Sequence, residues 1–528
     1  MPAVLLLRAD AGPQIGMGHV MRCLALAEPW LQAGSTVTLL TAPRAGGLQP
    51  PSTGSDNSAE RRLQTAGTDA LRSRAEALSI SLRELSAVPG SPADAAETIA
   101  LARSLRATWL VLDGYHFDAA FQRAVKAAGL PLLVFDDTAH AAHYSADFIL
   151  NQNLGATAAL YPHREPSTRL LLGTRFVQLR GELTASNRSA EHRSAGSEER
   201  PKAEQCSALR LLVTLGGSDP DNVTAQVLSV LRTIPNLTAD IILGPANPHA
   251  DALRAAISHL PSPISIHINP PNLPALMSRA DLAICAGGTT AWELSFLGVP
   301  MLVLVLAENQ RANGERLAQA GAAIHTSIAT LAADLRSLIS DSQRRAEMSR
   351  RARALVDGLG TFRVWLRMNE DALHLRPATA DDCRRVWEWA NDPAVRAVSF
   401  TSESIPWEQH VTWFTRKLAD ANTRLWIAEQ DGAPLGQVRF DLAGSTATIS
   451  VSLDAARRGK NLGALLIWSA CQKLFHEAAI ESIHALIKPD NAASIRAFEK
   501  AGFEPAGQTE VKGCAALRFE LKRSAAEP

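Results

Sequence analysis

Paired cysteines are missing from this chain of 528 residues. The six cysteines are scattered, and no two of them form a C-x-x-C motif; they are Cys23, Cys206, Cys285, Cys383, Cys471 and Cys514. This spacing argues against a zinc site or a disulfide framework and predicts a reducing, cytoplasmic location. Because no other cluster of metal-ligating residues is visible, the sequence predicts no metal cofactor.

An excess of one charge and long apolar runs are also missing. The 53 basic residues balance the 53 acidic ones, so no overall field favours nucleic acid or an anionic membrane as a partner. The longest apolar runs, such as MLVLVLA at 301–307, are far shorter than the ~20 residues that span a bilayer. The N-terminus has no basic leader, so we expect no signal peptide. Small molecules therefore remain as the expected class of binding partner. The sequence does not indicate the oligomeric state.

The chain is long, and strand-like and helical segments alternate regularly along it. Its length predicts about three domains. Strand-like runs such as VLLLRA and ATWLVLDG alternate with amphipathic helical stretches, apart from a surface insertion at 44–75. This alternation predicts parallel sheets with right-handed crossovers. We expect two Rossmann-like domains at 1–183 and 208–370, joined by a flexible polar linker at 184–207.

The last part of the chain, 371–528, predicts an α+β domain. The segment RLWIAEQDGAPLGQVRF is typical of a hairpin that turns at Asp431–Gly432. The strand-like segment ATISVSLD is followed by RRGKNLGALLIWSACQKLF, which is typical of a glycine turn leading into a helix.

Glycine turns follow three predicted strands of the first two domains. They contain Gly16-Met17-Gly18, Gly216-Gly217-Ser218 and Gly287-Gly288-Thr289-Thr290. Such turns let backbone N–H groups approach an anion. None of them is a G-x-G-x-x-G motif, which disfavours a dinucleotide-dependent dehydrogenase. The two turns in the second domain suit a diphosphate.

Polar residues near these strand ends are candidates for ligand contacts. His19 follows the first glycine turn and is either a general base or a capping residue. Glu293 either accepts from ribose hydroxyls or stabilises a helix N-terminus. The other candidates for a sugar pocket are Asp10, Asp113, Tyr115 and Asn151. Asn309 and Gln310 are expected at the end of the next strand, where they could bind sugar hydroxyls or form a turn. Asp136 and Asp137 are interpreted as caps of a turn at a strand end.

Several of these motifs, in order, resemble the nucleotide-sugar hydrolase of pseudaminic acid biosynthesis. They are RADAGPQIGMGHVMRCLALA, LVLDGYHFD, ADFILNQNLGA, LLGTRFVQLRGEL, LVTLGGSDPDNVT and ADLAICAGGTTAWELSFLGVPMLVLVLAENQ. That family has the two-domain GT-B fold and removes UDP from UDP-2,4-diacetamido-2,4,6-trideoxy-β-L-altropyranose. The resemblance implies that His19, with Gly18 beside it, activates water, and that 216–218, 287–290 and Glu293 bind UDP. The family's Asp-His-Tyr is here Asp113-Gly114-Tyr115-His116, so its middle histidine is absent or displaced.

The last domain resembles the GNAT acetyltransferase family, through the loop after ATISVSLD and the segment ALIKPDNAASIRAFEKAGF. The resemblance implies acetyl-CoA as co-substrate. Asn461 replaces a common glycine but tolerates positive φ, and Phe498 stands where many relatives have a tyrosine general acid. The implied acetyl-CoA contacts are Arg458, Gly459, Lys460, Asn461, Leu462, Gly463, Ala464, Asn491 and Ser494.

The two resemblances together predict a bifunctional enzyme with consecutive steps. The last domain acetylates a UDP-4-amino sugar, and the first two domains then release UDP. Three alternatives stay open at this point. They are a GT-B glycosyltransferase, a hydrolase for another nonulosonic acid or a spore-coat sugar, and a non-catalytic sugar-nucleotide binding protein.

Overall fold

The computed structural model describes most of the chain in two compact units. The described residues are 3–12, 17–42, 58–184, 208–217, 219–235, 237–245, 247–257 and 263–523, without the side chains of 58–66. Gly16, Cys206, Ser218 and 185–207 lie outside the described residues. One unit comprises Met1–Leu31 with Ser35–Thr361, and the other comprises Gln32–Gly34 with Phe362–Pro528.

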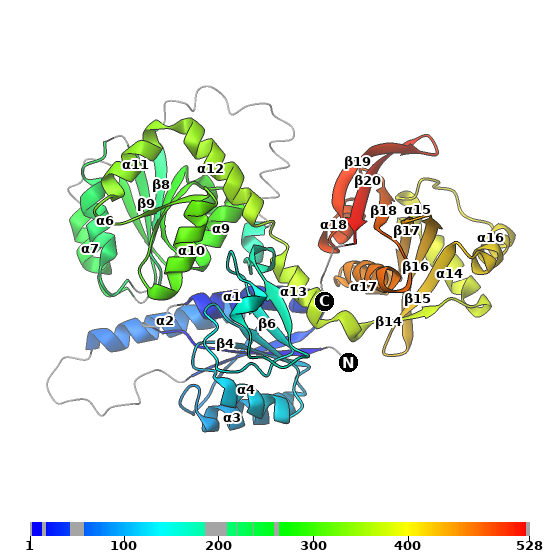
Figure 1. Cartoon of the computed structure of the whole chain (residues 1–528), viewed down its shortest axis with the longest axis horizontal. Coiled ribbons are helices and arrows are strands. Elements are labelled where there is room, and N and C mark those ends of the chain that lie inside the picture. Colours follow the sequence, from blue (N-terminus) through cyan, green and yellow to red (C-terminus); the bar gives the residue numbers. More distant parts are fainter. Residues whose placement is uncertain are drawn as a thin grey trace. The chain divides into compact units, whose positions relative to one another are not determined.

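The first unit contains two parallel sheets covered by helices (Figure 1). The N-terminal sheet is all parallel, in the order β3-β2-β1-β4-β5-β6-β7. Its strands are β1 (Val4–Ala9), β2 (Thr36–Thr41), β3 (Ser81–Glu84), β4 (Trp109–Asp113), β5 (Leu132–Phe135), β6 (Phe148–Asn151) and β7 (Arg169–Leu172). Its helices are α1 (Gly18–Gln32), α2 (Ser58–Ala77), α3 (Pro92–Leu105) and α4 (Ala119–Ala127), with 3-10 turns at Ala158–Leu160 and Thr174–Phe176.

Local sequence explains where these elements begin and end. β1 is the run VLLLRA, and all but its first residue are buried, as expected for a central parallel strand. After α1, Gly34 takes a φ of 83°, a left-handed conformation that ends a helix. The side chain of Ser91 accepts from the backbone N–H of Asp94 and caps α3. The insertion expected at 44–75 contains most of α2.

The second sheet is also all parallel, in the order β10-β9-β8-β11-β12-β13. Its strands are β8 (Leu209–Thr214), β9 (Leu237–Leu243), β10 (Ile264–Ile268), β11 (Leu282–Ala286), β12 (Met301–Leu304) and β13 (Ala323–Thr326). The helices of this half are α6 (Val223–Leu231), α7 (Ala250–Ile257), α8 (Leu273–Arg279), α9 (Thr289–Leu297), α10 (Glu308–Gln319), α11 (Leu331–Ser340) and α12 (Ser342–Leu355). Along the chain, α13 (Gly360–Met368) begins at the end of the first unit and continues into the second.

Both parallel sheets reverse their strand order at one point. In the N-terminal sheet the reversal lies between β1 and β4, where Ala9 pairs with Asp113. In the second sheet it lies between β8 and β11. Open α/β sheets bind ligands outside the carboxyl ends of the strands at such a switch point. His19, Gly217 and Gly288 all follow these strands, so the fold places them at the expected ligand edge.

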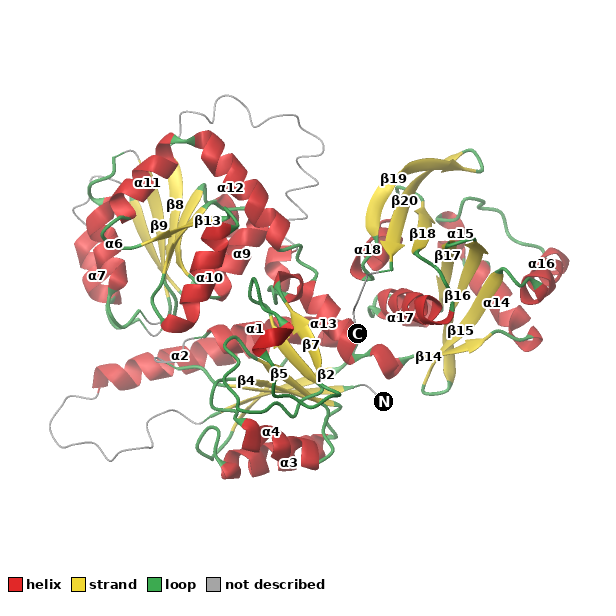
Figure 2. Ribbon diagram, in the orientation of Figure 1, coloured by secondary structure: helices red, strands yellow, loops and turns green. Residues whose placement is uncertain are grey.

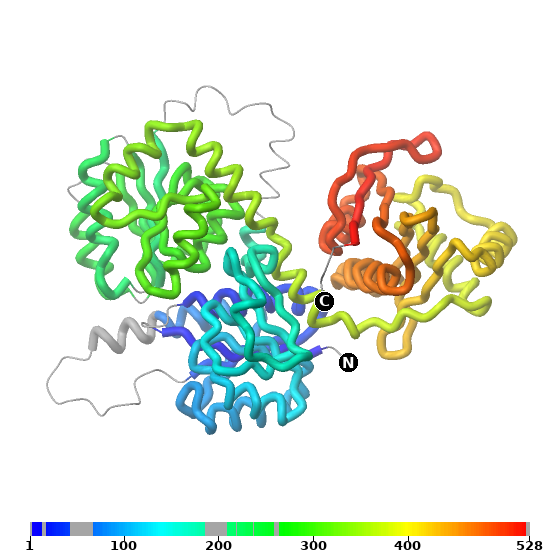
Figure 3. The backbone as a smooth tube through the Cα atoms, in the orientation of Figure 1, coloured from blue at the N-terminus to red at the C-terminus, as the bar shows by residue number. Residues whose placement is uncertain are grey.

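The second unit has a mixed sheet of seven strands in the order β14-β15-β16-β17-β18-β20-β19 (Figure 2). The strands are β14 (His374–Pro377), β15 (Thr423–Gln430), β16 (Ala433–Ala443), β17 (Thr446–Leu453), β18 (Ser482–Ile487), β19 (Glu504–Val511) and β20 (Cys514–Lys522). The helices are α14 (Cys383–Ala390), α15 (Pro393–Ala397), α16 (Trp407–Ala419), α17 (Leu462–Glu477) and α18 (Ala492–Lys500). The chain passes from β18 through α18 into the β19–β20 hairpin (Figure 3).

Two features of this sheet bear on function. The predicted hairpin turn is confirmed, because Asp431 and Gly432 both have positive φ, as a two-residue primed turn requires. β17 and β18 are the parallel pair, and they pair only from Thr446 to Thr448. β16 continues to pair with β17 as far as Leu453. Within the described parts of the chain, no strand therefore pairs with the β18 side of β17 over 449–453.

None of the helices in the described parts of the chain is long and apolar enough to cross a membrane. The same described residues contain no group of three or more His, Cys, Asp or Glu that could hold a metal ion.

Candidate active site

His19 forms a buried pair with Asp113 at the switch point of the N-terminal sheet. Nδ1 of His19 lies 2.5 Å from Oδ1 of Asp113, and the His19 side chain is 11% exposed while that of Asp113 is fully buried. A carboxylate accepts a hydrogen bond, so it fixes the proton on Nδ1 and leaves Nε2 as the basic nitrogen. No described group hydrogen-bonds Nε2, which therefore remains available to a substrate.

Arg22 holds this carboxylate from the other side. Its Nε and Nη2 donate to the two oxygens of Asp113 at 2.6 and 2.7 Å, and its Nη1 donates to Asp137 at 2.8 and 2.9 Å. Burial by itself raises the pKa of Asp113, but Arg22 and His19 outweigh it and hold that pKa well below its usual range. Asp113 is therefore an ionised acceptor for His19 at neutral pH.

Tyr115 extends the network to the second half of the unit. Its hydroxyl donates to Asp137 at 3.2 Å and accepts from Nδ2 of Asn309 at 3.1 Å. Its ring meets the His19 ring edge to face at 5.3 Å between centroids. A second link between the halves runs from Asn313 to Asn153 at 2.9 Å. Hydrogen bonds thus connect α10 to the catalytic candidate His19.

The glycine turns of the two halves face each other. A Cβ added at Gly18 would lie 3.6 Å from Oγ1 of Thr289, and one added at Gly217 would lie 3.7 Å from the backbone nitrogen of Met17. Gly288 precedes the first turn of α9, where backbone N–H groups have no intrahelical acceptor. The structure thus brings His19 and the turns at 216–217 and 287–290 to one place.

Three predicted ligand contacts already have protein partners. Both oxygens of Glu293 accept from Arg180, at 2.7 and 2.8 Å. Oε1 of Gln310 accepts from the backbone N–H of Leu306 at 3.1 Å. Nδ2 of Asn151 donates to the hydroxyl of Tyr161 at 2.8 Å. Their contacts with UDP or sugar stay predictions.

The expected strand end at Asn309 and Gln310 is wrong. β12 already ends at Leu304, and both residues lie in the first turn of α10. Glu308 provides a carboxylate in that turn, which favours a helix start there.

Asp10 is bound to structural partners beside the His19 pair. It accepts from Arg8 at 2.5 Å and from the backbone N–H of Ala42 at 2.5 Å, and it lies 3.0 Å from Nε2 of His116. Burial raises the pKa of Asp10, but the nearby His116 and the charge of Arg8 outweigh it and hold that pKa well below its usual range. A sugar contact by Asp10 stays a prediction.

The Asp136-Asp137 pair divides into two roles. Asp136 accepts from the backbone N–H groups of Thr138 and Ala139, both at 2.7 Å, in agreement with the interpretation as a turn cap. Asp137 instead belongs to the Arg22 and Tyr115 network.

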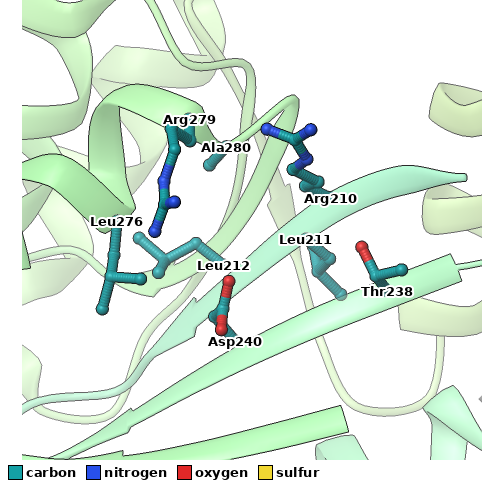
Figure 4. Close-up of a pocket in the computed structure, with 8 residues that line it drawn as sticks. All are labelled: Arg210, Leu211, Leu212, Thr238, Asp240, Leu276, Arg279 and Ala280. Carbon is teal, nitrogen blue, oxygen red and sulfur yellow. The ribbon is translucent and has the colours of Figure 1, made fainter. Parts of the chain in front are cut away.

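A surface pocket of about 260 Å³ lies elsewhere in the second half (Figure 4). Its strand residues come from the first part of β8 and β9, whereas the glycine turns follow the carboxyl ends of strands. It is therefore separate from the site around His19. Its lining residues are Arg210, Leu211, Leu212, Thr238, Asp240, Leu276, Arg279 and Ala280.

In the second unit, the predicted acetyl-CoA loop joins β17 to α17. Gly459 and Asn461 have φ values of 78° and 60°, so the asparagine takes the left-handed conformation that glycine would favour. Nζ of Lys500 donates to Oδ1 of Asn461 at 2.7 Å. The guanidinium of Arg458 donates to Asp392 at 2.9 Å. Lys460 is exposed, and Leu462, Gly463 and Ala464 form the first turn of α17.

The later segment of the GNAT resemblance forms α18. Oδ1 of Asn491 accepts from the backbone N–H of Ser494 at 3.1 Å and caps the helix. Phe498 is buried and packs edge to face on Phe503.

The sequence did not indicate a role for Arg22, and it predicted only a turn cap for Asp137. A signal for Arg22 was present, because it lies three residues after His19 in the same helix and so shares its face, and apolar residues follow it from Cys23 to Ala27. No sequence signal connected Arg180 to Glu293, which lie 113 positions apart.

Two family models match separate parts of the chain. Residues 211–359 match the glycosyltransferase family 28 C-terminal domain, and residues 372–504 match the acetyltransferase (GNAT) domain. Together with the three sheets, these matches confirm the predicted fold class: two Rossmann-like domains of GT-B type followed by an α+β GNAT domain. One part of the chain is thus similar to a glycosyltransferase family 28 domain and a later part to a GNAT acetyltransferase domain.

Three relatives cover different extents of the chain. The uncharacterized protein MJ1062 of Methanocaldococcus jannaschii is 20% identical over 513 residues, which are 94% of this chain and 95% of that protein. The spore coat polysaccharide biosynthesis protein SpsG of Bacillus subtilis is 34% identical over 163 residues, 29% of this chain and 48% of SpsG. The aminoglycoside N(6′)-acetyltransferase type 1 of Klebsiella pneumoniae is 25% identical over 175 residues, 30% of this chain and 87% of that protein.

Proposed function

We propose that the chain is a bifunctional enzyme of pseudaminic acid biosynthesis. The GNAT domain acetylates the amine of a UDP-4-amino sugar. The first unit hydrolyses UDP-2,4-diacetamido-2,4,6-trideoxy-β-L-altropyranose to UDP and the free sugar. The observation that carries the proposal is the His19–Asp113 pair, because it leaves a basic Nε2 beside the glycine turns of the second half.

In the hydrolysis, Nε2 of His19 takes a proton from a water molecule as the water oxygen attacks the anomeric carbon. The bond from that carbon to the diphosphate oxygen breaks, and UDP leaves with both electrons of the bond. Attack opposite the leaving group inverts the anomeric centre. Asp113 stabilises the imidazolium that forms, as a carboxylate does behind a catalytic histidine.

The nucleotide binds on the other side, at 216–218 and 287–290. The first-turn N–H groups of α9 and the positive end of its helix dipole favour a diphosphate. Such donors also stabilise the charge that develops on UDP as it leaves, and one of them is worth roughly 3–4 kcal/mol.

The GNAT domain offers a second anion site. The loop at 458–464 has left-handed residues at Gly459 and Asn461 and leads into the N-terminus of α17, which suits the pyrophosphate of acetyl-CoA. The unpaired side of β17 at 449–453 suits an extended arm that continues from it. In the transfer, the amine nitrogen forms a bond to the thioester carbonyl carbon, the C–S bond breaks, and the proton lost by the amine ends on the coenzyme A thiol.

Product analysis in ¹⁸O-water tests the proposal with the full-length protein. The UDP-4-amino sugar and acetyl-CoA are added together, and masses are followed with time. We expect one acetyl group on the UDP-sugar first, then UDP without ¹⁸O and a free sugar with ¹⁸O at the anomeric carbon. Absence of acetyl gain overturns the transferase assignment, and ¹⁸O in UDP overturns attack at the anomeric carbon.

A second candidate for the first unit is glycosyl transfer to an acceptor hydroxyl. The match to the glycosyltransferase family 28 C-terminal domain favours it, and the similarity to SpsG favours a different sugar. The same His19 would then deprotonate the acceptor. UDP release that requires an added acceptor supports this candidate, whereas release in water alone supports hydrolysis.

A further inference from the structure

One buried amide in the second unit has an unused hydrogen-bond acceptor. Gln437 on β16 is 6% exposed, and its Oε1 has no hydrogen-bond partner among the described residues. Its Nε2 makes one long contact of 3.5 Å with Oγ of Ser452 on β17. A buried acceptor without a donor destabilises the fold, because it has lost its hydrogen bonds to water without replacement. A donor on a bound ligand would satisfy this oxygen.

The register of the sheet shows which face carries Gln437. It pairs directly with Ile427 on β15 and with Ser452 on β17, so the three side chains share a face. Ile427 packs in a cluster with Val386 of α14 and Phe414 of α16. Gly436, the preceding residue, approaches Leu466 of α17 on the opposite face. Gln437 therefore faces α14 and α16, away from the helix that follows the predicted acetyl-CoA loop.

A carboxylate lies next to this pair. Asp454, two residues after Ser452, accepts from the indole N–H of Trp389 on α14 at 3.1 Å, which places it on the α14 side as well. Ser452 lies within the stretch of β17 that has no partner on its β18 side. Gln437 and Ser452 thus place an amide oxygen and a hydroxyl on one face of the sheet, and the carboxylate of Asp454 follows at the end of β17. This set suits a cationic hydrogen-bond donor.

We propose that Gln437 and Ser452 bind the acceptor amine of the acetyltransferase unit, a primary amine on a nucleotide-linked sugar. This assignment rests on the proposed acetyl transfer and specifies where its second substrate binds. Oε1 of Gln437 accepts an N–H of the amine, which orients the nitrogen toward the thioester along the open side of β17. The acceptor thus approaches from the α14 and α16 face, and acetyl-CoA from the α17 face.

Steady-state kinetics of coenzyme A release by the full-length protein test this site. Gln437→Met keeps the shape of the side chain and removes the acceptor. We expect it to raise KM for a UDP-4-amino-4,6-dideoxyhexose about 10-fold and to leave KM for acetyl-CoA within about twofold. The unfolding temperature stays the same or rises, because the lost oxygen had no protein partner. Ser469→Ala is the matched control: its Oγ is also buried without a partner, but it lies on α17.

An unchanged KM for the amine in Gln437→Met overturns the site. A lower unfolding temperature with both KM values raised also overturns it, because that result assigns Gln437 a structural role. If the wild type shows no turnover, side-chain amide NMR of ¹⁵N-glutamine-labelled protein decides, with the Gln437 signal identified by its loss in Gln437→Met. A shift caused by the amino sugar but not by its 4-keto analogue supports the site and shows that acetyl transfer failed. No shift overturns the site.

Discussion

Nδ2 of Asn309 donates a hydrogen bond to the hydroxyl of Tyr115 across the two halves of the first unit, at 3.1 Å. Tyr115 in turn donates to Asp137, which Arg22 joins to Asp113 and so to His19. A residue in the first turn of α10 is thus connected to His19 by hydrogen bonds alone.

This connection predicts energetic coupling between Tyr115 and Asn309. In a double-mutant cycle on kcat/KM for UDP release, Tyr115→Phe and Asn309→Ala should be non-additive by about 0.5–1.5 kcal/mol, the worth of one hydrogen bond. Arg311→Ala, on the same helix but paired with Glu308, should be additive with Tyr115→Phe. Additivity in both cycles would refute the connection.

His19→Asn should remove the general base and keep a polar side chain. We expect kcat for UDP release to fall about 10²–10⁴-fold, because a positioned base contributes that much. The affinity for UDP should remain near that of the wild type, as measured by calorimetry. Acetyl transfer by the same protein serves as the internal control, and wild-type UDP release would exclude His19 as the base.

Asp113→Asn should disable the histidine without removing it. An amide can donate to Nδ1, which favours the tautomer that carries the proton on Nε2. We expect kcat to fall by about 10²-fold or more while KM changes little. Asp136→Asn is a suitable comparison, since Asp136 caps a turn and does not contact His19. Equal losses in both variants would show that Asp113 has only a structural role.

Arg22→Met should destabilise the first unit. It leaves the buried carboxylate of Asp113 and the partly buried carboxylate of Asp137 without their common cation, which costs about 3–5 kcal/mol. Calorimetry of the full chain measures this effect as a lower unfolding temperature of the first unit. The transition of that unit is identified as the one whose temperature rises when UDP is added. Arg72→Met removes an exposed ion pair with Glu84 and should cost less than about 1 kcal/mol. Equal unfolding temperatures of the first unit in Arg22→Met and the wild type would contradict the expected cost of burying these carboxylates without a cation.

Acid should destabilise the first unit through Asp10 and Asp113. Both have a pKa held below the ordinary value by hydrogen bonds and cationic neighbours, despite burial. Such a carboxyl stabilises the fold above its unfolded pKa of about 3.9 and loses that contribution as pH falls below it. We expect the unfolding temperature to fall with increasing steepness as the pH decreases below about 4. Asp10→Asn should flatten that slope, and an unchanged slope would contradict this assignment.

The sequence predicted the features that depend on local chain order. Glycine turns after strand-like runs, the hairpin at Asp431–Gly432 and the cap at Asn491 are all readable from neighbouring residues. The position of His19 at a ligand edge follows from the same alternation of strands and helices.

The hydrogen-bond partners of the candidate residues could not be predicted from neighbouring residues in the sequence. Asp113 contacts His19 only because β1 and β4 are neighbours in the sheet, which strand order decides. Arg180 neutralises Glu293 through a contact between distant segments. The unpartnered oxygen of Gln437 is a property of packing, and the sequence shows only a glutamine in a strand.

The two glycine turns that suit a diphosphate and the histidine that suits a base lie on opposite sides of the linker in chain order. His19, Arg22 and Asp113 all precede residue 184, so a chimera that replaced the second half would keep every hydrogen bond among them. It would exchange Asn309 and the turns around it. The hydrogen-bonded group around His19 is thus complete within the first half of the unit, whereas its connection to Asn309 depends on the second half.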